Sequence, residues 1–197
     1  MQRFRLAALP PAPWRNGGGV TREIARGALD GATQWDWRLS VARIAHDGPF
    51  STFPGIDRVA TLLDGAVRLE SAAQTLAWTA PGEAHGFAGE TAFTARLDGG
   101  GARFFNVMAR RGRLVATVVA HRTSLVLAPA QAVQHAVLVL NGCFAVETPA
   151  GTERLEAEDG LLCAGARPAL RATLAAPTGC LVEVRLSVAM GANAPAS

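Results

Sequence analysis

An internal repeat is the feature that most restricts the folds open to this chain of 197 residues. When the sequence is shifted by 77 residues, the turn Asp64-Gly65 falls on Asn141-Gly142, and Leu69-Glu70 falls on Val146-Glu147. Turn residues therefore coincide with turn residues, which indicates duplication of one unit. Two copies of a short-stranded unit, each too large for a propeller blade, predict two small β-barrels or jelly rolls packed together.

The segments between the turns alternate in the manner of β-strands. In Trp35–Ile44, apolar residues such as Trp37 and Leu39 occupy one face, while Arg38 and Ser40 lie on the other face and are available to line a site. No window has a sustained period of 3.6 residues, so we predict an all-β chain. Further short strands are expected at Val20–Arg26, Arg58–Leu63, Ala66–Glu70, Thr75–Thr79, Thr91–Leu97, Phe104–Ala109, Leu114–Ala120, Ser124–Leu127, Ala136–Leu140, Cys143–Thr148, Ala169–Leu174 and Leu181–Val188.

Charge and cysteine content bear on the classes of function. The net charge is +3, but every basic residue is arginine and the longest basic run is Arg110-Arg111-Gly112-Arg113, so we expect no nucleic-acid partner. No apolar run reaches the roughly 18 residues of a membrane span, and the N-terminus does not resemble a signal peptide. The widely spaced Cys143, Cys163 and Cys180 lie in apolar runs and indicate reduced thiols. We therefore expect no membrane association and a cytoplasmic location.

The stretch from Trp14 to Glu23 is the least ordinary part of the chain. Its consecutive glycines, Gly17, Gly18 and Gly19, permit positive φ and let another group approach the main chain closely. Successive N–H groups in such a turn can form a concavity that attracts anions. Around the glycines are an indole, an amide, a hydroxyl, a carboxylate and two guanidinium groups. The alternatives are a plain turn with Trp14 as a core residue, or a ligand site.

Several motifs resemble those of a known family. Leu62-Leu63-Asp64-Gly65 and Val139-Leu140-Asn141-Gly142 stand where cupin barrels have their strand-to-hairpin turn. More specifically, the chain is similar to the HutD/Ves family of double cupins, named after genes in bacterial histidine-utilisation clusters. The residues that carry this resemblance are Trp14–Glu23, Trp37–Ala42, Asp47–Ser51, Phe53–Arg58, Leu62–Gly65 and Phe105–Met108.

The resemblance implies a bicupin, an all-β protein of two cupin-type (RmlC-like jelly-roll) barrels. Residues 1–109 would form an N-terminal arm and a first barrel with the ligand site, and residues 110–197 would form a degenerate second barrel. This division follows from a match that is specific over most of the first half and diffuse in the second. Phe104 stands where the family pattern favours aspartate, which implies a modified pocket in this member.

The sequence lacks the motifs that metal binding and nucleophilic catalysis require. Metal-binding cupins carry a His-x-His pair on one strand, and the corresponding place here reads Phe50-Ser51-Thr52-Phe53. Of the four histidines, only His85 falls at a cupin ligand spacing, and it has no visible partner. We therefore predict no metal and no cofactor. No nucleophile motif is present, whereas acid–base catalysis by Glu23, Asp47 or Asp57 stays open.

A small-molecule pocket in the first barrel fits these residues best. Arg38 and Arg58 can each bind a carboxylate through two hydrogen bonds, and the alternative is that they pair with Glu23 and Asp57 as internal salt bridges. The mouth of a β-barrel lined by aromatic residues is a common ligand location. The predicted ligand site comprises Trp14, Asn16, Gly17, Gly18, Gly19, Thr21, Glu23, Arg38, Phe50, Asp57 and Arg58.

These expectations favour a non-catalytic binder or regulator of a small carboxylate metabolite over an enzyme. The resemblance to a family linked to histidine degradation implies urocanate or N-formylglutamate as candidate ligands. The alternative is a metal-independent cupin enzyme, an isomerase or hydrolase, that acts on a small acidic metabolite. Whether the chain forms a homodimer is left open.

Overall fold

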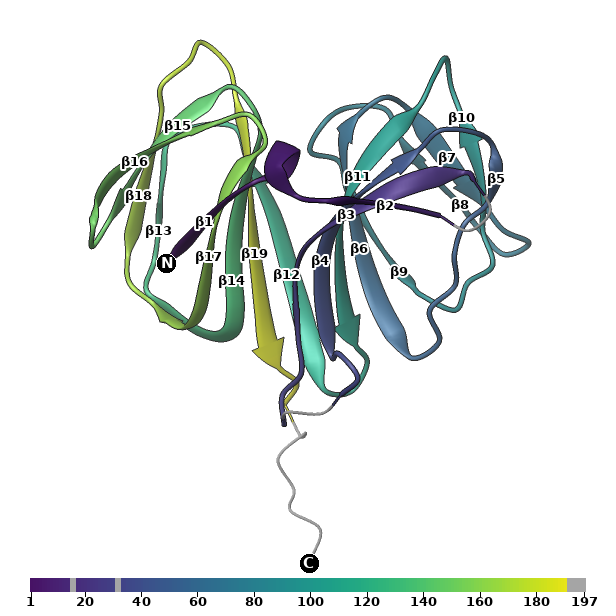
Figure 1. Ribbon diagram of the computed structural model, residues 1–197, viewed down its shortest axis with the longest axis horizontal. Helices are drawn as coiled ribbons and strands as arrows, with labels where there is room; N and C mark the ends of the chain where they lie inside the picture. Colours follow the sequence, from purple (N-terminus) through teal and green to yellow (C-terminus); the bar gives the residue numbers. More distant parts are fainter. Residues whose placement is uncertain (15–16, 31–32, 191–197) are drawn as a thin grey trace, which may run out of the picture.

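The computed structural model describes residues 1–14, 17–30 and 33–190, and almost all of its regular structure is strand (Figure 1). Within those ranges the helical content is one 3-10 turn, η1 (Leu6–Ala8), and no helix is long and apolar enough to cross a membrane. Two barrels lie side by side, each formed by a larger and a smaller antiparallel sheet. The predictions of an all-β fold and of two barrels are confirmed.

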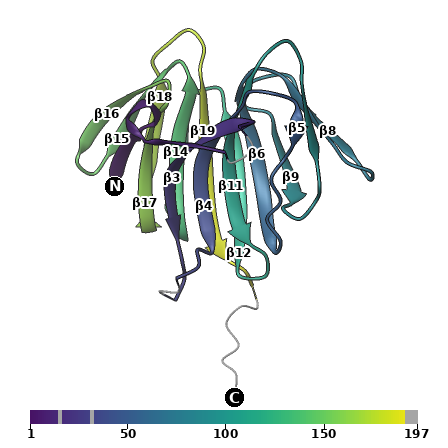
Figure 2. The ribbon, with the colours of Figure 1, turned by 45° about the vertical axis from the view of Figure 1, so that its right-hand side comes forward.

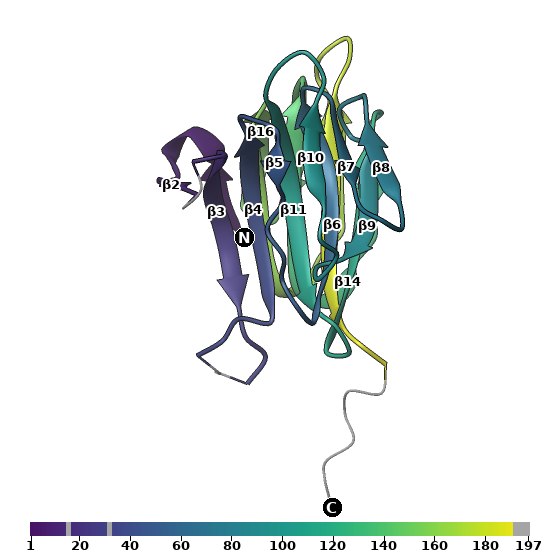
Figure 3. The ribbon, with the colours of Figure 1, turned by 90° about the vertical axis from the view of Figure 1, so that its right-hand side faces the viewer.

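The first barrel is built from the first half of the chain. Its larger sheet has the strand order β2-β3-β4-β11-β6-β9, and its smaller sheet has the order β5-β10-β7-β8. Figure 3 shows β3, β4, β11 and β6 next to one another. The strands are β2 (Pro11–Pro13), β3 (Gly19–Gly27), β4 (Trp37–Ile44), β5 (Gly48–Pro49), β6 (Ile56–Asp64), β7 (Val67–Glu70), β8 (Thr75–Trp78), β9 (Ala84–Ala88), β10 (Thr94–Leu97) and β11 (Ala102–Arg110).

The second barrel takes its strands from the second half of the chain, with one exception at the N-terminus. Its larger sheet has the order β1-β17-β14-β19-β12, and its smaller sheet has the order β13-β18-β15-β16. The strands are β1 (Gln2–Arg5), β12 (Leu114–His121), β13 (Leu125–Leu127), β14 (Ala130–Asn141), β15 (Cys143–Thr148), β16 (Gly151–Glu156), β17 (Asp159–Arg167), β18 (Leu170–Leu174) and β19 (Cys180–Val188).

The two barrels repeat the same strand arrangement. A shift of 77 residues places β4 on β12, β6 on β14, and β11 on β19. The corresponding neighbours also agree, because the order β4-β11-β6-β9 in the first barrel matches β12-β19-β14-β17 in the second. The repeat in the sequence therefore reflects two copies of one barrel, and residues 77 positions apart occupy equivalent places.

Three clusters of buried side chains form the core. One lies between the barrels, where the apolar face of β4 (Trp37, Leu39 and Val41) belongs to the same cluster as Leu138 and Val182 of the second barrel (Figure 2). The other two clusters fill the interiors of the two barrels. Burying a large apolar side chain stabilises the fold by about 1.5–3 kcal/mol. The apolar face of β4 therefore helps to hold the barrels together, and its polar face is left to the interior of the first barrel.

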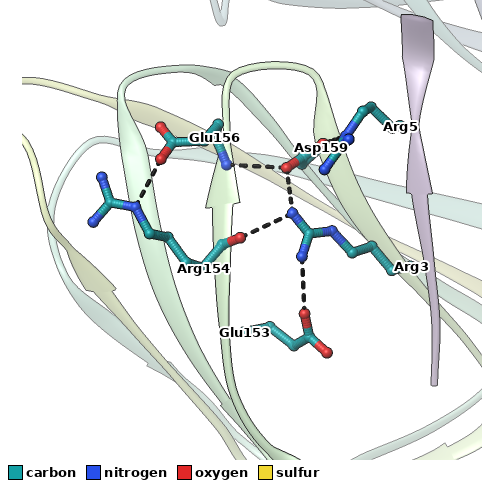
Figure 4. Close-up of polar contacts among 6 residues, drawn as sticks. All are labelled: Arg3, Arg5, Glu153, Arg154, Glu156 and Asp159. Atoms are coloured by element: carbon teal, nitrogen blue, oxygen red, sulfur yellow. Dashed lines mark hydrogen bonds and ion pairs between the residues drawn. The ribbon is translucent and has the colours of Figure 1, made fainter. Parts of the chain in front are cut away.

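The N-terminal strand crosses to the other barrel. β1 pairs with β17, so the structure places residues 2–5 on the second barrel, whereas the sequence assigned residues 1–109 to the first unit. Arg3 and Arg5 donate to the carboxylate of Asp159 at 2.6 and 2.9 Å (Figure 4). Burial acts to raise the pKa of Asp159, but its hydrogen bonds to Arg3 and Arg5 outweigh burial and hold it below its usual range. The position of residues 2–5 on the second barrel thus depends on the pairing of two strands that are far apart in the chain.

The sequence pattern missed six strands: β1, β2, β5, β9, β16 and β17. β9 contains Gly86 and a single buried aromatic residue, Phe87, so its alternation is weak. β16 has one buried side chain, Leu155, and reads as a polar segment. Strands with so few apolar residues are held by the hydrogen bonds of a neighbouring strand, which a local pattern does not reveal.

Candidate functional site

A cavity of about 50 Å³ lies against the inner face of the larger sheet in the first barrel. The strand register brings its polar side chains together: Met108 lies opposite Arg38 and Arg58 on the two neighbouring strands, and Asn106 lies opposite Ser40. Residues paired across strands point to the same face of a sheet. The cavity is lined by Trp14, Thr21, Arg38, Ser40, Ala42, Phe50, Ser51, Phe53, Arg58, Asn106 and Met108.

Arg58 is the most unusual group in this wall, because its side chain is almost completely buried, with 4% exposed. Its Nη1 donates to the carbonyl oxygen of Ser51 and its Nη2 to Oδ1 of Asn106, both at 2.9 Å. The guanidinium carbon lies 4.5 Å from the ring centre of Phe50 and 5.2 Å from that of Phe53, within the range of cation–π attraction. The Nε atom has no hydrogen-bond partner.

Arg58 has no ion-pair partner in the part of the chain that the structure describes; its two hydrogen-bond acceptors are neutral oxygens. Burial, and after it the positive charge of Arg38, lowers the pKa of Arg58 to about 9. The side chain is therefore still charged at neutral pH. An isolated buried charge costs several kcal/mol, and an anion in the cavity would offset this cost.

Arg38 lines the same cavity in a different environment. Its Nε donates to Oε2 of Glu23 at 2.8 Å, so for this arginine the structure agrees with the salt-bridge alternative. The structure does not show the corresponding salt bridge between Arg58 and Asp57, because Asp57 is exposed and accepts a hydrogen bond from Nε of Arg111 at 2.7 Å. Of the two predicted carboxylates, Glu23 orients a wall residue, and Asp57 lies outside the cavity.

Trp14 and the glycine-rich loop adjoin the cavity on one side. The Trp14 indole N–H donates to Oγ1 of Thr21 at 2.8 Å, and its ring meets that of Phe50 edge-on, with centroids 6.4 Å apart. Gly17 and Gly18 line a second cavity of about 210 Å³, which has Trp14 and Phe50 in common with the first. The aromatic pair thus belongs to both cavities, which are called the inner cavity (about 50 Å³) and the outer cavity (about 210 Å³).

Gly19 serves the sheet rather than the cavity. A Cβ atom at this position would clash with the carbonyl oxygen of Arg43 on the paired strand β4, so only glycine allows this close approach. The predicted site residue Asn16 lies outside the described residues. Neighbouring glycines of the loop therefore differ in role: Gly19 allows the close approach of β3 and β4, whereas Gly17 and Gly18 line the second cavity.

The donor set of the inner cavity does not suit a metal ion. Arg58 is a cation and Asn106 a neutral amide, and among the described residues the lining holds no imidazole, thiol or carboxylate. His85, at the cupin ligand spacing, instead contacts the carbonyl oxygen of Ala77 at 2.9 Å and the ring of Trp78, 4.7 Å away between centroids. Across the described ranges no group of three or more His, Cys, Asp or Glu residues is placed to hold a metal. The absence of a metal stays a prediction.

Sequence reasoning did not include three polar or flexible lining residues, Ser51, Asn106 and Met108, in the site. Asn106 gave one signal, since it interrupts an apolar run on the same face of β11 as Phe104. Phe104 itself is fully buried and packs edge-on against Trp78, with centroids 4.7 Å apart. It therefore contributes to the barrel core beside the site and does not line the cavity.

The second barrel has different residues at the equivalent positions. The shift of 77 residues places His135 at the position of Arg58, and Glu183 at that of Asn106. His135 is buried without a hydrogen bond of good geometry to its ring, and Arg167 donates to Oε1 of Glu183 at 3.1 Å. The cavity there measures only about 10 Å³, too little for more than one water molecule. The first barrel is therefore the better candidate for a ligand.

The chain matches one family along most of its length. The family model described as HutD matches residues 6–182. An uncharacterized 21.2 kDa protein in the hutC 3′ region of Pseudomonas putida is 40% identical over 109 residues, which are 55% of this chain and 57% of that protein. Protein Ves of Citrobacter koseri is 41% identical over 127 residues, which are 62% of this chain and 65% of that protein. The matches thus span less than two thirds of these two curated relatives.

Solved structures agree over nearly the whole chain. HutD from Pseudomonas fluorescens SBW25, determined in a formate condition, has a TM-score of 0.81 and 27% identity, with 95% of this chain and 98% of that chain covered. A cupin 2 conserved barrel domain protein from Leptotrichia buccalis has a TM-score of 0.62 and 10% identity, with 94% and 96% covered. The second likeness shows the fold alone, and that fold is the cupin fold.

Proposed function

This chain belongs to the HutD family, and we propose that it is a non-catalytic binder of a small carboxylate metabolite and acts as a regulator through this binding. The ligand site is the inner cavity of the first barrel. The relative in the hutC 3′ region links the family to histidine utilisation, and urocanate and N-formylglutamate are acidic intermediates of that degradation. Both carry a carboxylate that an arginine can bind.

The buried Arg58 carries the proposal. Its guanidinium faces a cavity and is held by the aromatic rings of Phe50 and Phe53 and by two neutral oxygens. Most arginines of the first barrel have a carboxylate partner, such as Glu23 for Arg38. A carboxylate ligand would give Arg58 the counter-charge that the described residues do not supply, through charge-assisted hydrogen bonds.

The two neighbouring cavities suggest how an elongated ligand would lie. The inner cavity of about 50 Å³ has room for a carboxylate group, and the outer cavity of about 210 Å³ beside Gly17 and Gly18 has room for the rest of the molecule. Trp14 and Phe50 belong to both cavities and would form the apolar wall. The Nε atom of Arg58, which has no partner, is an available donor.

Binding is favoured over catalysis by the chemistry of the lining. The described lining of the inner cavity contains no carboxylate, imidazole or thiol, which are the usual general acids, bases and nucleophiles. The ionisable groups of this described lining are the guanidiniums of Arg38 and Arg58. Two fixed positive charges among aromatic rings can hold an anion, but they provide no partner for proton transfer at neutral pH.

Ligand-dependent thermal unfolding of the whole chain tests the proposal. Formate, urocanate and N-formylglutamate are titrated against the wild type, the Arg58→Met variant and the Arg68→Ala variant. Arg68 is an exposed arginine of β7 and controls for the loss of one positive charge. A ligand at about 100 times its dissociation constant adds about 2.7 kcal/mol, which raises Tm by roughly 5 to 11 °C in a chain of this size.

The wild type and Arg68→Ala should show this saturable shift, and Arg58→Met should lose it. Equal affinity of Arg58→Met and wild type would show that Arg58 is structural and would overturn the site. The absorbance of urocanate, followed during the same incubation, separates the two functions. Turnover of any of the three compounds would contradict the non-catalytic function and favour the alternative of a metal-independent enzyme.

A further inference from the structure

A groove of about 530 Å³ lies between the two barrels, away from the cavity of the first barrel. It is bounded by the N-terminal arm at Leu6 and Pro11, by the outer face of β3, β4 and β11, and by Glu158 in the turn that precedes β17. Its size falls within the range of about 300–1,000 Å³ that is usual for small-molecule sites, and such sites are frequent between domains. Figure 1 shows η1 crossing above the space between the barrels.

Three arginines project from one face of three adjacent strands into this groove: Arg22 on β3, Arg43 on β4 and Arg103 on β11. Arg43 and Arg103 are direct cross-strand partners. Arg22 is paired with Val41, two residues before Arg43 on the same face of β4. Like charges opposite each other destabilise a sheet, so this arrangement needs negative charge nearby.

Within the described ranges carboxylates contact only one of the three. Arg103 donates to Asp64 at 2.7 Å and to Glu158 at 2.6 Å, so this one guanidinium is paired with two negative charges. Arg22 donates to a backbone carbonyl of the N-terminal arm and has no carboxylate. Arg43 is exposed and has neither a hydrogen bond nor an ion pair from its side chain within the described ranges. Within the described ranges Arg22 and Arg43 thus have no carboxylate partner, and the three arginines and two carboxylates that line the groove carry a net charge of +1.

Glu158 supports a role for the groove beyond packing. It has a φ of 71°, the one positive value at a non-glycine residue in the described ranges, and such a conformation is unfavourable for a residue with a side chain. Glycine would fit this turn more easily, but it could not reach Arg103. The N–H of Leu6 donates to the carbonyl oxygen of Glu158 at 3.0 Å, so the same residue ties the arm and both barrels together at the groove.

We propose that this groove is a second ligand site, specific for a small dicarboxylate, in which Arg22 and Arg43 each bind one carboxylate group. Arg103 keeps its two protein partners, Asp64 and Glu158. A dicarboxylate can pair with the guanidiniums of Arg22 and Arg43 at the same time, whereas a monocarboxylate can pair with one of them. Because the arm and both barrels line the groove, the ligand also strengthens their mutual contact.

Calorimetric titration of the whole chain with succinate at low ionic strength tests this inference independently of the proposed function. The Arg58→Met variant removes the proposed site of the first barrel, and Arg58→Met/Arg43→Gln additionally removes an exposed groove arginine that makes no contact needed for folding. Arg58→Met/Arg68→Gln is the control with the same loss of charge. Acetate serves as the monoanionic comparison.

Arg58→Met and its Arg68→Gln control should bind succinate at least about tenfold more tightly than acetate. Arg58→Met/Arg43→Gln should bind succinate at least about tenfold more weakly than these two proteins, because a hydrogen bond to a charged group is lost. Succinate should also slow amide exchange at residues 6–9 and 158–160 of the wild type. Loss of succinate binding in Arg58→Met, equal affinity with and without Arg43, or equal affinity for acetate would each overturn the inference.

Discussion

Replacing Arg58 by methionine should make the unliganded protein more stable while it abolishes carboxylate binding. The side chain of Arg58 is 4% exposed, and its hydrogen-bond acceptors in the described part of the chain are Oδ1 of Asn106 and the carbonyl oxygen of Ser51. Methionine has a similar length and can occupy the space beside the aromatic rings without bringing a charge into it. A buried charge that is replaced by an apolar group of similar volume is often neutral or stabilising.

The pKa of Arg58 gives the expected magnitude. A value of about 9 lies more than three pKa units below that of an exposed arginine, and at 1.36 kcal/mol per unit the buried charge costs about 4 to 5 kcal/mol. The substitution also removes the hydrogen bonds to Asn106 and Ser51 and the cation–π contacts with the neighbouring rings, which together cost about 2 to 4 kcal/mol. The net gain of about 1 kcal/mol corresponds to a rise in Tm of roughly 2 to 4 °C.

Unfolding in urea between pH 7.5 and 10.5 provides the assay, because the gain depends on pH. In the folded state Arg58 loses its proton near pH 9, whereas in the unfolded chain it remains protonated. The unfolded wild type then binds the additional proton, so wild-type stability rises with pH by about 1.4 kcal/mol per unit from this group. The advantage of Arg58→Met is therefore present below pH 9 and shrinks above it.

The composition limits the number of other side chains that titrate in the pH range of this comparison. The chain contains no lysine and no tyrosine, two residue types that ordinarily titrate near pH 10. A decrease in the Tm of the unliganded variant would refute the reasoning, since it would mean that Arg58 stabilises the fold. A stability difference that stays constant from pH 8 to 10.5 would also refute it, because Arg58 would then have no lowered pKa.

Three further outcomes are expected from the fold. Gly19→Ala should prevent normal pairing of β3 with β4, because its Cβ would clash with the carbonyl oxygen of Arg43, and circular dichroism at rising temperature should show a loss of more than about 2 kcal/mol. Asp159→Asn should cost about 2 to 3 kcal/mol by weakening both hydrogen bonds from the arginines of β1, and amide exchange at Arg3 should accelerate. Burial lowers the pKa of His135 below 6.5, so the unfolded chain takes up the proton first as the pH falls. Wild-type stability should therefore decrease below about pH 6.5, and the urea midpoint of His135→Gln should decrease less.

Much of the architecture could be predicted from local pattern and from the repeat. Alternation in β4 correctly separated the apolar side chains Trp37 and Leu39 from Arg38 and Ser40, and the structure places the first pair between the barrels and the second beside the cavity. The paired turns around Gly65 and Gly142 indicated two equivalent units. Such features depend on residues that are close together in the sequence, so a period of two or a turn can be recognised directly from the sequence.

The candidate site was predicted in part. Trp14, Thr21, Arg38, Phe50 and Arg58 do line one cavity. The sequence did not place Ser51 or Asn106 there, and it treated Arg38 and Arg58 as equivalent. No local signal distinguishes two arginines on neighbouring strands, because the distinction depends on which carboxylates come close.

What the sequence by itself determined is thus the all-β class, the duplication and the faces of the main strands. The tertiary structure decided that β1 joins the second barrel, that Glu23 reaches Arg38, and that Arg58 lies beside a cavity with no carboxylate partner among the described residues. The physical reason is the range of the interactions. Side-chain alternation acts between adjacent residues, whereas strand pairing, burial and the energy of a charge depend on groups that are far apart in the chain and meet only after folding.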